Sequence, residues 1–404
     1  MSKKEYLFKM KQYAIINGLV VLLDKIETGK VILLKQSKIE AISDRNSIDL
    51  TNYQVIDAEN GYISPGLIDI HTHGAFYHTF NDADKKSYET ILKADIKSGV
   101  TTIAPTLLAV PIPELINALE FIHEWRNNQK TGMTFLTGAY LESPYIAPDQ
   151  HGAISASALR TPDDGSIDSL LEFYNDIKVF MIAPELPGSV DAYKKIVKKG
   201  IIGSMGHSNA IESEILPCIQ AGASHVTHLW SAMSTVTRKG PWRQPGLLEV
   251  ALTHSELSCE IIADGCHLPG TLMKMALQCK GTGRLCAVSD ALNGAGLPEG
   301  THFSAGDMEY EVHDGVGMVL DHSCFAGSTT LLGKMIPILI QKAGLSISDA
   351  FRITTETPAK ILGENDHIGS LKPGYDADIV IFERNNFSVQ KLIQKGNLID
   401  LKNM

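Results

Sequence analysis

The sequence predicts an α/β protein: a TIM-type (β/α)8 barrel with a small β-sandwich domain built from both ends of the chain. Between residues 65 and 365, apolar runs alternate with helical patterns, as expected of a parallel α/β fold. Seven of these runs, and an expected eighth, end in polar residues. Barrel enzymes build their sites at the carboxyl ends of the strands. The alternative, a doubly wound open sheet, is disfavoured because no glycine-rich phosphate loop follows the first run.

Each barrel element is predicted from its own local pattern. The expected strands are the apolar runs 67–74, 101–106, 135–142, 179–185, 201–207, 225–228, 259–267 and 285–290. Helical periodicity marks residues 85–97, 113–127, 190–199, 210–220, 246–254, 270–280, 330–343 and 347–362. In the second of these, Leu115, Leu119 and Ile122 form a one-sided apolar stripe.

The two ends of the chain have a different pattern. Short apolar runs bounded by turns between residues 12 and 62 predict β strands. The same style resumes after Gly369. We therefore expect a small β domain from residues 1–64 plus 366–404, and a barrel domain from residues 65–365.

Composition excludes several classes of partner. The chain has 404 residues and a formal net charge of -10, which argues against binding to nucleic acid or an anionic membrane. No apolar stretch approaches the ~20 residues of a membrane span, and the N-terminus lacks a signal-peptide pattern. The six cysteines include no CxxC pair. We expect a cytoplasmic protein with reduced thiols.

Side chains with metal-ligand chemistry follow several of the predicted strands. His71 and His73 are two residues apart, so on a strand both rings face the same side and can hold one cation. Glu142 ends the third run, where burial of a carboxylate is costly unless it is paired or metal-bound. His207 follows the fifth run. Their coincidence at strand ends favours a metal site over separate structural roles.

Two further positions require a choice. His225 and His228 are three residues apart, so on an extended segment their rings face opposite sides. We expect His228, nearer the carboxyl end, to face the barrel mouth and His225 to be structural. Asp290 ends the last run. Its structural alternative is to cap the next turn, because Asp is a common residue at the start of loops.

Taken in order, these motifs resemble those of the amidohydrolase superfamily and, within it, the N-acetylglucosamine-6-phosphate deacetylase family. The resemblance covers most of the chain and is carried by residues 65–74 (PGLIDIHTHG), 99–107, 141–148, 183–185, 206–208, 227–233, 243–246, 262–267, 288–291, 326–328 and 374–378. Many superfamily members carry a carboxylated lysine on the fourth strand. This chain has Ala-Pro-Glu185 there and Glu142 on the third strand, which indicates the deacetylase branch.

The resemblance implies a set of metal ligands and a catalytic residue. The main divalent metal is expected on Glu142, His207 and His228. A second is expected on His71 and His73, with Glu142 and Asp290. Some family members lack the His pair, so one or two metals per subunit remain open, with zinc as first choice and iron or manganese as alternatives. Asp290 is expected to take a proton from water and to deliver it to the departing nitrogen.

The resemblance also implies a substrate and a partner. The substrate is expected to be an amino-sugar phosphate, N-acetylglucosamine 6-phosphate, whose acetamide is hydrolysed. His267 and Arg243 are expected to bind the phosphate, with Arg243 reaching across from the other subunit of a homodimer. The backbone at Ser231 and Ala232 is expected to supply further donors.

Two departures from the family pattern keep alternatives open. The family has Asn where this chain has Ser231, and it commonly has His or Gln where this chain has Ile154. His151 is not an obvious replacement. The alternatives are the galactosamine epimer, an amide substrate without phosphate, and a non-catalytic scaffold with a structural metal. The last is disfavoured because every expected ligand position is intact.

Overall fold

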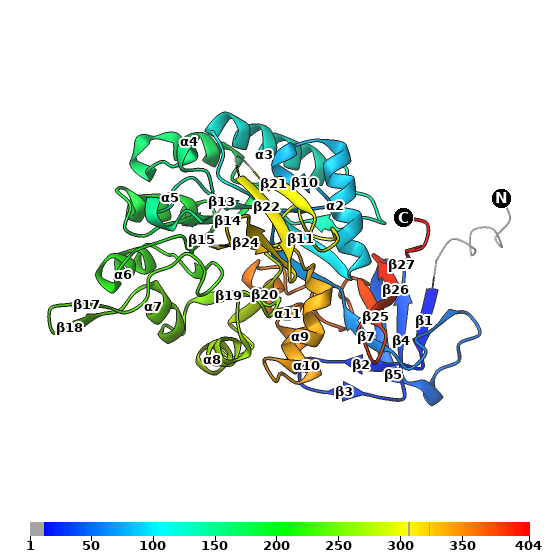
Figure 1. Cartoon of the computed structure of the whole chain (residues 1–404). Helices are drawn as coiled ribbons and strands as arrows, with labels where there is room; N and C mark the ends of the chain where they lie inside the picture. The colour runs from blue at the N-terminus through cyan, green and yellow to red at the C-terminus, as the bar shows by residue number, and fades with distance from the viewer. Residues whose placement is uncertain (1–11, 153, 306–307, 323) are drawn as a thin grey trace.

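Parallel strands at the centre of the protein (Figure 1) form a nearly closed ring. The computed structural model describes residues 12–152, 154–305, 308–322 and 324–404. The ring follows chain order: β8 (Leu67–Thr72), β11 (Val100–Leu107), β13 (Ala139–Glu142), β14 (Ile177–Ile182), β15 (Ile202–Met205), β16 (His225–Val226), β19 (Ser258–Ile262) and β20 (Leu285–Val288). Each predicted apolar run contributes one of these strands, with β12 (Phe135–Leu136) as an extra piece of the third run. The predicted barrel is confirmed.

The first and last strands meet at their carboxyl ends. The Asp290 amide donates to the carbonyl of His71 at 2.9 Å, and the His73 amide donates to the carbonyl of Ala291 at 2.8 Å. Deeper in the barrel, the Asp69 carboxylate accepts a hydrogen bond from the Ser289 amide at 3.2 Å. Closure therefore holds the tip of β8 against the segment that follows β20.

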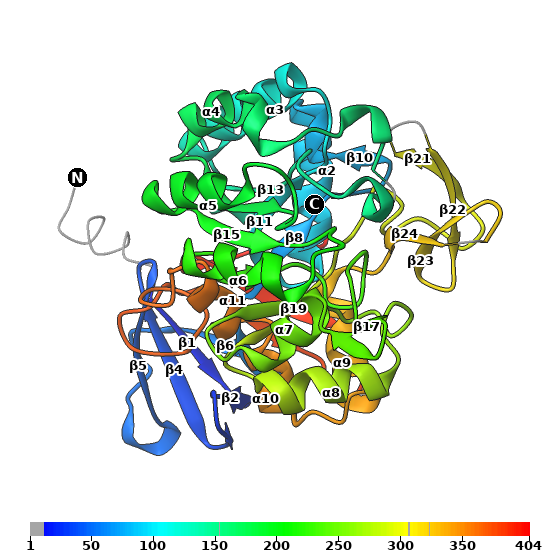
Figure 2. The ribbon, with the colours of Figure 1, turned by 90° about the vertical axis from the view of Figure 1, so that its left-hand side faces the viewer.

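Helices cover the outside of the barrel (Figures 1 and 2). They are α2 (Lys85–Lys97), α3 (Ile112–Asn127), α4 (Ser166–Leu170), α5 (Ser189–Lys198), α6 (Glu212–Gln220), α7 (Leu247–Thr253), α8 (Gly270–Lys280), α9 (Ile336–Gln341), α10 (Ile347–Arg352) and α11 (Glu356–Ile361). The helix predicted over 347–362 is two helices. Pro358 has no N–H, and its ring would clash with the carbonyl of Thr354 in a continuous helix. That carbonyl instead accepts from the Ile68 amide at 2.9 Å.

Strands from both ends of the chain form two further sheets. One has the order β5–β4–β1–β6, from β1 (Gln12–Ile16), β4 (Lys30–Lys35), β5 (Lys38–Asp44) and β6 (Gln54–Asp57). The other has the order β27–β26–β25–β7–β2–β3, from β2 (Leu19–Val21), β3 (Ile26–Glu27), β7 (Tyr62–Pro65), β25 (Ile379–Phe382), β26 (Val389–Gln394) and β27 (Asn397–Leu398).

The two terminal sheets pack face to face. Ile15 and Ile32 of the first sheet share an apolar core with Ile63 and Ile381 of the second. Strand β25, near the C-terminus, pairs with β7, near the N-terminus. This is the arrangement of a β sandwich built from both ends. The domain boundaries at residues 64 and 366 stay a prediction.

Two insertions at the barrel mouth are absent from the sequence prediction. The first is an exposed hairpin, β17 (Thr237–Lys239) and β18 (Trp242–Gln244). The second is a four-stranded antiparallel sheet after β20, drawn in yellow in Figure 1. It comprises β21 (His302–Ala305), β22 (Met308–His313), β23 (Val316–Val319) and β24 (Phe325–Ser328).

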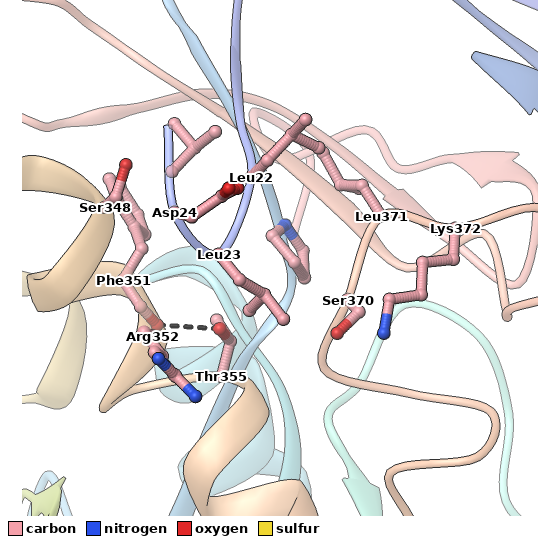
Figure 3. Close-up of a pocket in the computed structure, with 12 residues that line it drawn as sticks. Leu22, Leu23, Asp24, Ser348, Phe351, Arg352, Thr355, Ser370, Leu371 and Lys372 are labelled. Carbon is pink, nitrogen blue, oxygen red and sulfur yellow. Dashed lines mark hydrogen bonds between the residues drawn. The ribbon is translucent and has the colours of Figure 1, made fainter. Parts of the chain in front are cut away.

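A cavity of about 250 Å³ lies where the terminal sheets meet the barrel (Figure 3). Its walls come from the β2–β3 connection, α10 and residues 370–372. Pro65, which precedes β8, also lines it, so this cavity lies at the amino-terminal end of the strands, away from their polar tips.

Among the described helices, none is long and apolar enough to cross a bilayer.

Candidate active site

A second cavity, of about 370 Å³, opens at the carboxyl ends of the barrel strands. Its lining includes eight of the residues predicted from the sequence: His73, Glu142, His207, His228, Ser231, Ala232, His267 and Asp290. Phe325 and Ala326 of the inserted sheet also line it. The site therefore lies where the fold class predicts it.

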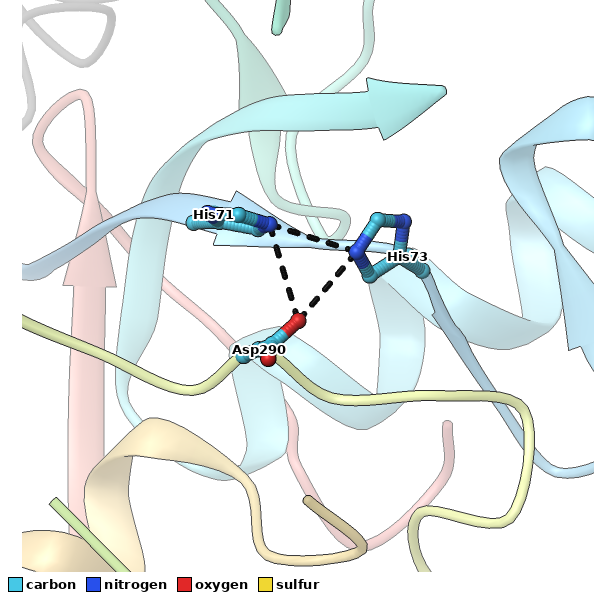
Figure 4. Close-up of side chains that lie close together, drawn as sticks. All are labelled: His71, His73 and Asp290. Carbon is cyan, nitrogen blue, oxygen red and sulfur yellow. Dashed lines mark hydrogen bonds and ion pairs between the residues drawn. The ribbon is translucent and has the colours of Figure 1, made fainter. Parts of the chain in front are cut away.

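His71, His73 and Asp290 meet on one side of this cavity (Figure 4). The Nε2 atoms of His71 and His73 are 3.2 Å apart. Asp290 Oδ1 lies 3.5 Å from His71 Nε2 and 3.2 Å from His73 Nε2. These spacings are those of ligand atoms that can share one ion.

Glu142, His207 and His228 meet beside the first group. Glu142 Oε1 lies 2.8 Å from His207 Nε2 and 3.2 Å from His228 Nε2. The two histidine Nε2 atoms are 3.2 Å apart. The other oxygen of Glu142 lies 3.5 Å from His73 Nε2, so this carboxylate connects the two groups.

Hydrogen bonds on the far side of two rings show what the near side can bind. His207 Nδ1 is 2.6 Å from the carbonyl of Gln150, and His71 Nδ1 is 2.9 Å from the Glu260 carboxylate. Both partners accept only, so each Nδ1 donates, and each ring in its neutral form offers a lone pair at Nε2. The Nε2 atom of His71 faces His73, and the Nε2 atom of His207 faces His228. Both nitrogens also face the carboxylate of Glu142. Such a converging set of nitrogen and oxygen acceptors fits a divalent metal.

The carboxylates in this site are ionised. Burial opposes the charge of Glu142, but His207 and His228 hold its pKa well below its usual range. Burial likewise opposes the charge of Asp290, but His71 and His73 lower its pKa. Although burial disfavours a charged ring, Glu260 and Asp290 raise the pKa of His71 to about 10. The site thus has a negative field that attracts cations.

Four non-glycine residues around the cavity have left-handed backbones. They are His207 (φ 44°), Trp230 (φ 70°), Ala232 (φ 43°) and Asp290 (φ 47°). Each costs conformational energy, and such positions cluster at functional sites. Here they turn the chain sharply after a strand, which brings the polar side chains into the cavity.

His267 is held at the cavity wall by two contacts. Its Nδ1 lies 2.7 Å from Asp264 Oδ2, and its ring packs against Phe325 with centroids 5.1 Å apart. Ser231 and Ala232 lie in the same lining. The predicted substrate-binding residues of this chain, Arg243 aside, therefore face one space.

Arg243 and Ile154 are placed differently from each other. Arg243 lies on the exposed strand β18, and its side chain donates to the carbonyl of Pro241 at 3.0 Å. It does not line the cavity of its own chain among the described residues. Ile154 does line it and is only 4% exposed. His151 donates to the Ile154 carbonyl at 2.7 Å, so it does not replace the missing polar side chain.

Sequence reasoning missed Glu260, a fully buried glutamate in the middle of β19. It contacts both His71 and His225. The available signal was a charged residue inside an apolar strand, which is costly without partners.

His225 lies below the metal-ligand groups, and its ring does not join them. Strand β16 ends at Val226, so the chain bends before His228.

Three curated relatives share sequence with most of this chain. The N-acetylglucosamine-6-phosphate deacetylase of Bacillus subtilis is 28% identical over 371 residues, covering 90% of this chain and 91% of the relative. The enzyme of that name from Caenorhabditis elegans is 30% identical, covering 82% and 81%. The N-acetylgalactosamine-6-phosphate deacetylase of Escherichia coli O157:H7 is 27% identical, covering 85% and 88%.

A solved structure and a family model agree with these relatives. The crystal structure of N-acetylglucosamine-6-phosphate deacetylase from Pasteurella multocida superposes with a TM-score of 0.89 at 26% identity, covering 96% of this chain and 99% of that one. The model of the Amidohydrolase family matches residues 62–399. Together with the converging ligand groups, this identifies a metal-dependent hydrolase that acts on an amide. The chain belongs to the amidohydrolase family.

Proposed function

We propose that this protein hydrolyses the acetamide of N-acetylglucosamine 6-phosphate to glucosamine 6-phosphate and acetate. The observation that carries the proposal is the convergence of Glu142, His207, His228 and Asp290 in one cavity. The deacetylase relatives, which match this chain over most of its length, support the choice of substrate. All six cysteines are free thiols, which supports a cytoplasmic location.

The metal ligands divide into two groups in this proposal. Glu142, His207 and His228 hold the main divalent metal, and the spacings of their ligand atoms, 2.8 to 3.2 Å, support this assignment. His71 and His73 hold a second, with Asp290. Zinc is the first choice, since histidine and carboxylate ligands suit it, and iron and manganese are the alternatives.

The side chains of the cavity perform the proton transfers. A divalent metal, when bound, supplies a Lewis acid that brings the pKa of water toward about 7 and polarises a carbonyl. Asp290, ionised and at the cavity edge, accepts the proton of the attacking water at its carboxylate. It then donates this proton to the amide nitrogen as the C–N bond breaks, because an amine leaves more easily than its anion.

The phosphate group requires positive charge that the cavity of one chain does not contain. Among the described lining residues there is no lysine or arginine. Arg243 lies on the exposed hairpin β17–β18. We propose that this hairpin brings Arg243 to the cavity of the partner in a homodimer, where it binds the phosphate together with His267.

Replacing Arg243 by Ala is expected to raise KM for the phosphorylated sugar about 10- to 100-fold, since a charge-assisted hydrogen bond contributes about 1.5–3 kcal/mol. Arg238→Ala is the matched control, because Arg238 lies directly opposite Arg243 on the same hairpin. The measurement is steady-state acetate release by each variant. Equal effects of the two substitutions would contradict the specific role of Arg243.

Acetate release from a panel of N-acetylated sugars, with and without the 6-phosphate and paired with metal counting, tests the proposed function. We expect turnover of N-acetylglucosamine 6-phosphate and at least 100-fold less of the unphosphorylated sugar. A fully metal-loaded protein that releases no acetate from any sugar phosphate rules the function out.

A second candidate is a different amide substrate, either N-acetylgalactosamine 6-phosphate or an amide without phosphate. The relative named N-acetylgalactosamine-6-phosphate deacetylase, the apolar Ile154 and the presence of Ser231 in place of Asn motivate it. Thermal unfolding separates the cases: the proposed function predicts that glucosamine 6-phosphate raises the midpoint and that glucosamine does not. No shift with any sugar phosphate favours the unphosphorylated amide.

A further inference from the structure

A polar layer lies inside the barrel directly below the metal-ligand groups. Barrel interiors are commonly filled by Val, Ile and Leu. Here Glu260 and His225 are both fully buried at this level. Their side chains form a continuous chain of hydrogen bonds that ends at His71. Burying these polar atoms costs free energy, which indicates that the layer has a functional role.

Glu260 stands at the centre of this layer. Its Oε2 accepts from His71 Nδ1 at 2.9 Å and from the backbone amide of His228 at 3.1 Å. Its Oε1 accepts from His225 Nε2 at 2.8 Å. One carboxylate therefore contacts a side chain from the His71 group and the backbone of the neighbouring group.

His225 holds this carboxylate from the other side. Its Nδ1 lies 2.7 Å from the hydroxyl of Ser258, so both ring nitrogens are bonded and the ring cannot rotate freely. Ser258 and Glu260 are two residues apart on β19 and face the same side. The position of Glu260 is thus fixed by its own strand and by a neighbouring one.

His71 differs from the other three histidines in what orients it. His207 donates to a neutral carbonyl, and within the described residues the Nδ1 atoms of His73 and His228 have no hydrogen-bond partner. Only His71 among these four rings has its Nδ1 bonded to a carboxylate. A carboxylate in this place fixes the tautomer and raises the basicity of the ligating nitrogen.

We infer that Glu260 is a positioning residue that sets the affinity of the His71–His73–Asp290 group for a divalent cation. The inference rests on the metal-binding role proposed above for that group. Glu260 keeps the proton on His71 Nδ1, so that Nε2 presents its lone pair toward His73 and Asp290. Without it, the His71 ring can flip or take the other tautomer, and this group loses a ligand.

The test is a Zn²⁺ titration of the metal-free full-length protein by chelator competition. His73→Asn first identifies which equivalent belongs to the His71 group. Glu260→Gln is expected to weaken that equivalent 10- to 100-fold and the other several-fold less. Glu260→Asp keeps the charge but is one methylene too short to reach both His71 and His225, so we expect a similar loss.

Asp176→Asn is the matched control. It breaks a hydrogen bond of the same kind, 2.8 Å from His123 Nδ1 to Asp176 Oδ2, outside the metal-ligand groups. Comparing the unfolding midpoints in chelator separates a general loss of stability from a loss of metal. Zn²⁺ binding by Asp176→Asn is expected to equal that of the wild type.

Three results overturn the inference: unchanged Zn²⁺ affinity in Glu260→Gln, an equal loss at both equivalents, or full recovery in Glu260→Asp. A wild type that binds no equivalent sensitive to His73→Asn overturns it as well. These readouts do not depend on turnover. A protein that binds both equivalents but releases no acetate refutes the proposed function and leaves the role of Glu260 standing.

Discussion

Replacing Asp290 by Asn is expected to lower kcat about 10³-fold, within the range of 10²- to 10⁴-fold that general acid–base catalysis contributes. Asn has nearly the same shape but cannot take a proton from water or return it to the leaving nitrogen. KM and the affinity of the main metal are expected to change little, because Glu142, His207 and His228 are untouched. The measurement is steady-state acetate release together with metal analysis of the same preparation.

Asp149→Asn is the control for this prediction. Asp149 also lines the cavity, so its substitution removes a negative charge from the same space without removing the proposed base. We expect kcat within a few-fold of wild type. An Asp290→Asn variant with wild-type kcat would refute the catalytic assignment, and a variant without metal would make Asp290 chiefly a ligand.

The barrel could be predicted because its signals are local. Each strand is a short apolar run, and each helix has its own periodic stripe. The common location of the side chains at the strand ends could be predicted from the fold, because parallel strands in a barrel end at the same face. This is why the sequence alone predicts that His71, His207 and Asp290 share one site, although His71 and Asp290 are 219 residues apart.

The polar layer below the site could not be predicted in the same way. The contact between His71 and Glu260 joins positions 189 residues apart. The sequence around Glu260 contains no pattern that indicates which side chains it contacts. The inserted sheet β21–β24 was also missed. Its first two strands alternate between buried and more exposed residues, as is common in antiparallel sheets. They therefore lack the continuous apolar runs that mark the barrel strands.

The broken helix at 347–362 shows a third kind of limit. Its apolar stripe continues across the break, so periodicity alone predicts one helix. The interruption depends on Pro358 and on a tertiary hydrogen bond from Ile68 to Thr354. The proline was visible in the sequence, but a proline in the first turn of a helix is also tolerated, and only the fold decides between the two.

Replacing Glu142 by Gln is expected to remove the main metal and nearly all activity. Glu142 is 3% exposed and contacts members of both ligand groups. Breaking a buried charged pair costs about 3–5 kcal/mol, which corresponds to a loss of metal affinity of roughly 10²- to 10³-fold or more. Because a ligand stabilises only the state that binds it, Zn²⁺ should raise the unfolding midpoint of this variant less than that of the wild type.

Glu185→Gln is the matched control for Glu142. Glu185 lies three residues after the neighbouring strand β14 and accepts from the Ser208 hydroxyl at 2.7 Å, and it is not among the described residues that line the cavity. Its variant should keep the Zn²⁺-dependent rise in midpoint, measured by thermal unfolding with and without chelator. If Glu142→Gln kept that rise too, the carboxylate would not be a ligand, and the charge that holds His207 and His228 together would have to come from Asp290 alone. That outcome is at odds with the geometry, because Glu142 lies within 3.2 Å of both of these rings.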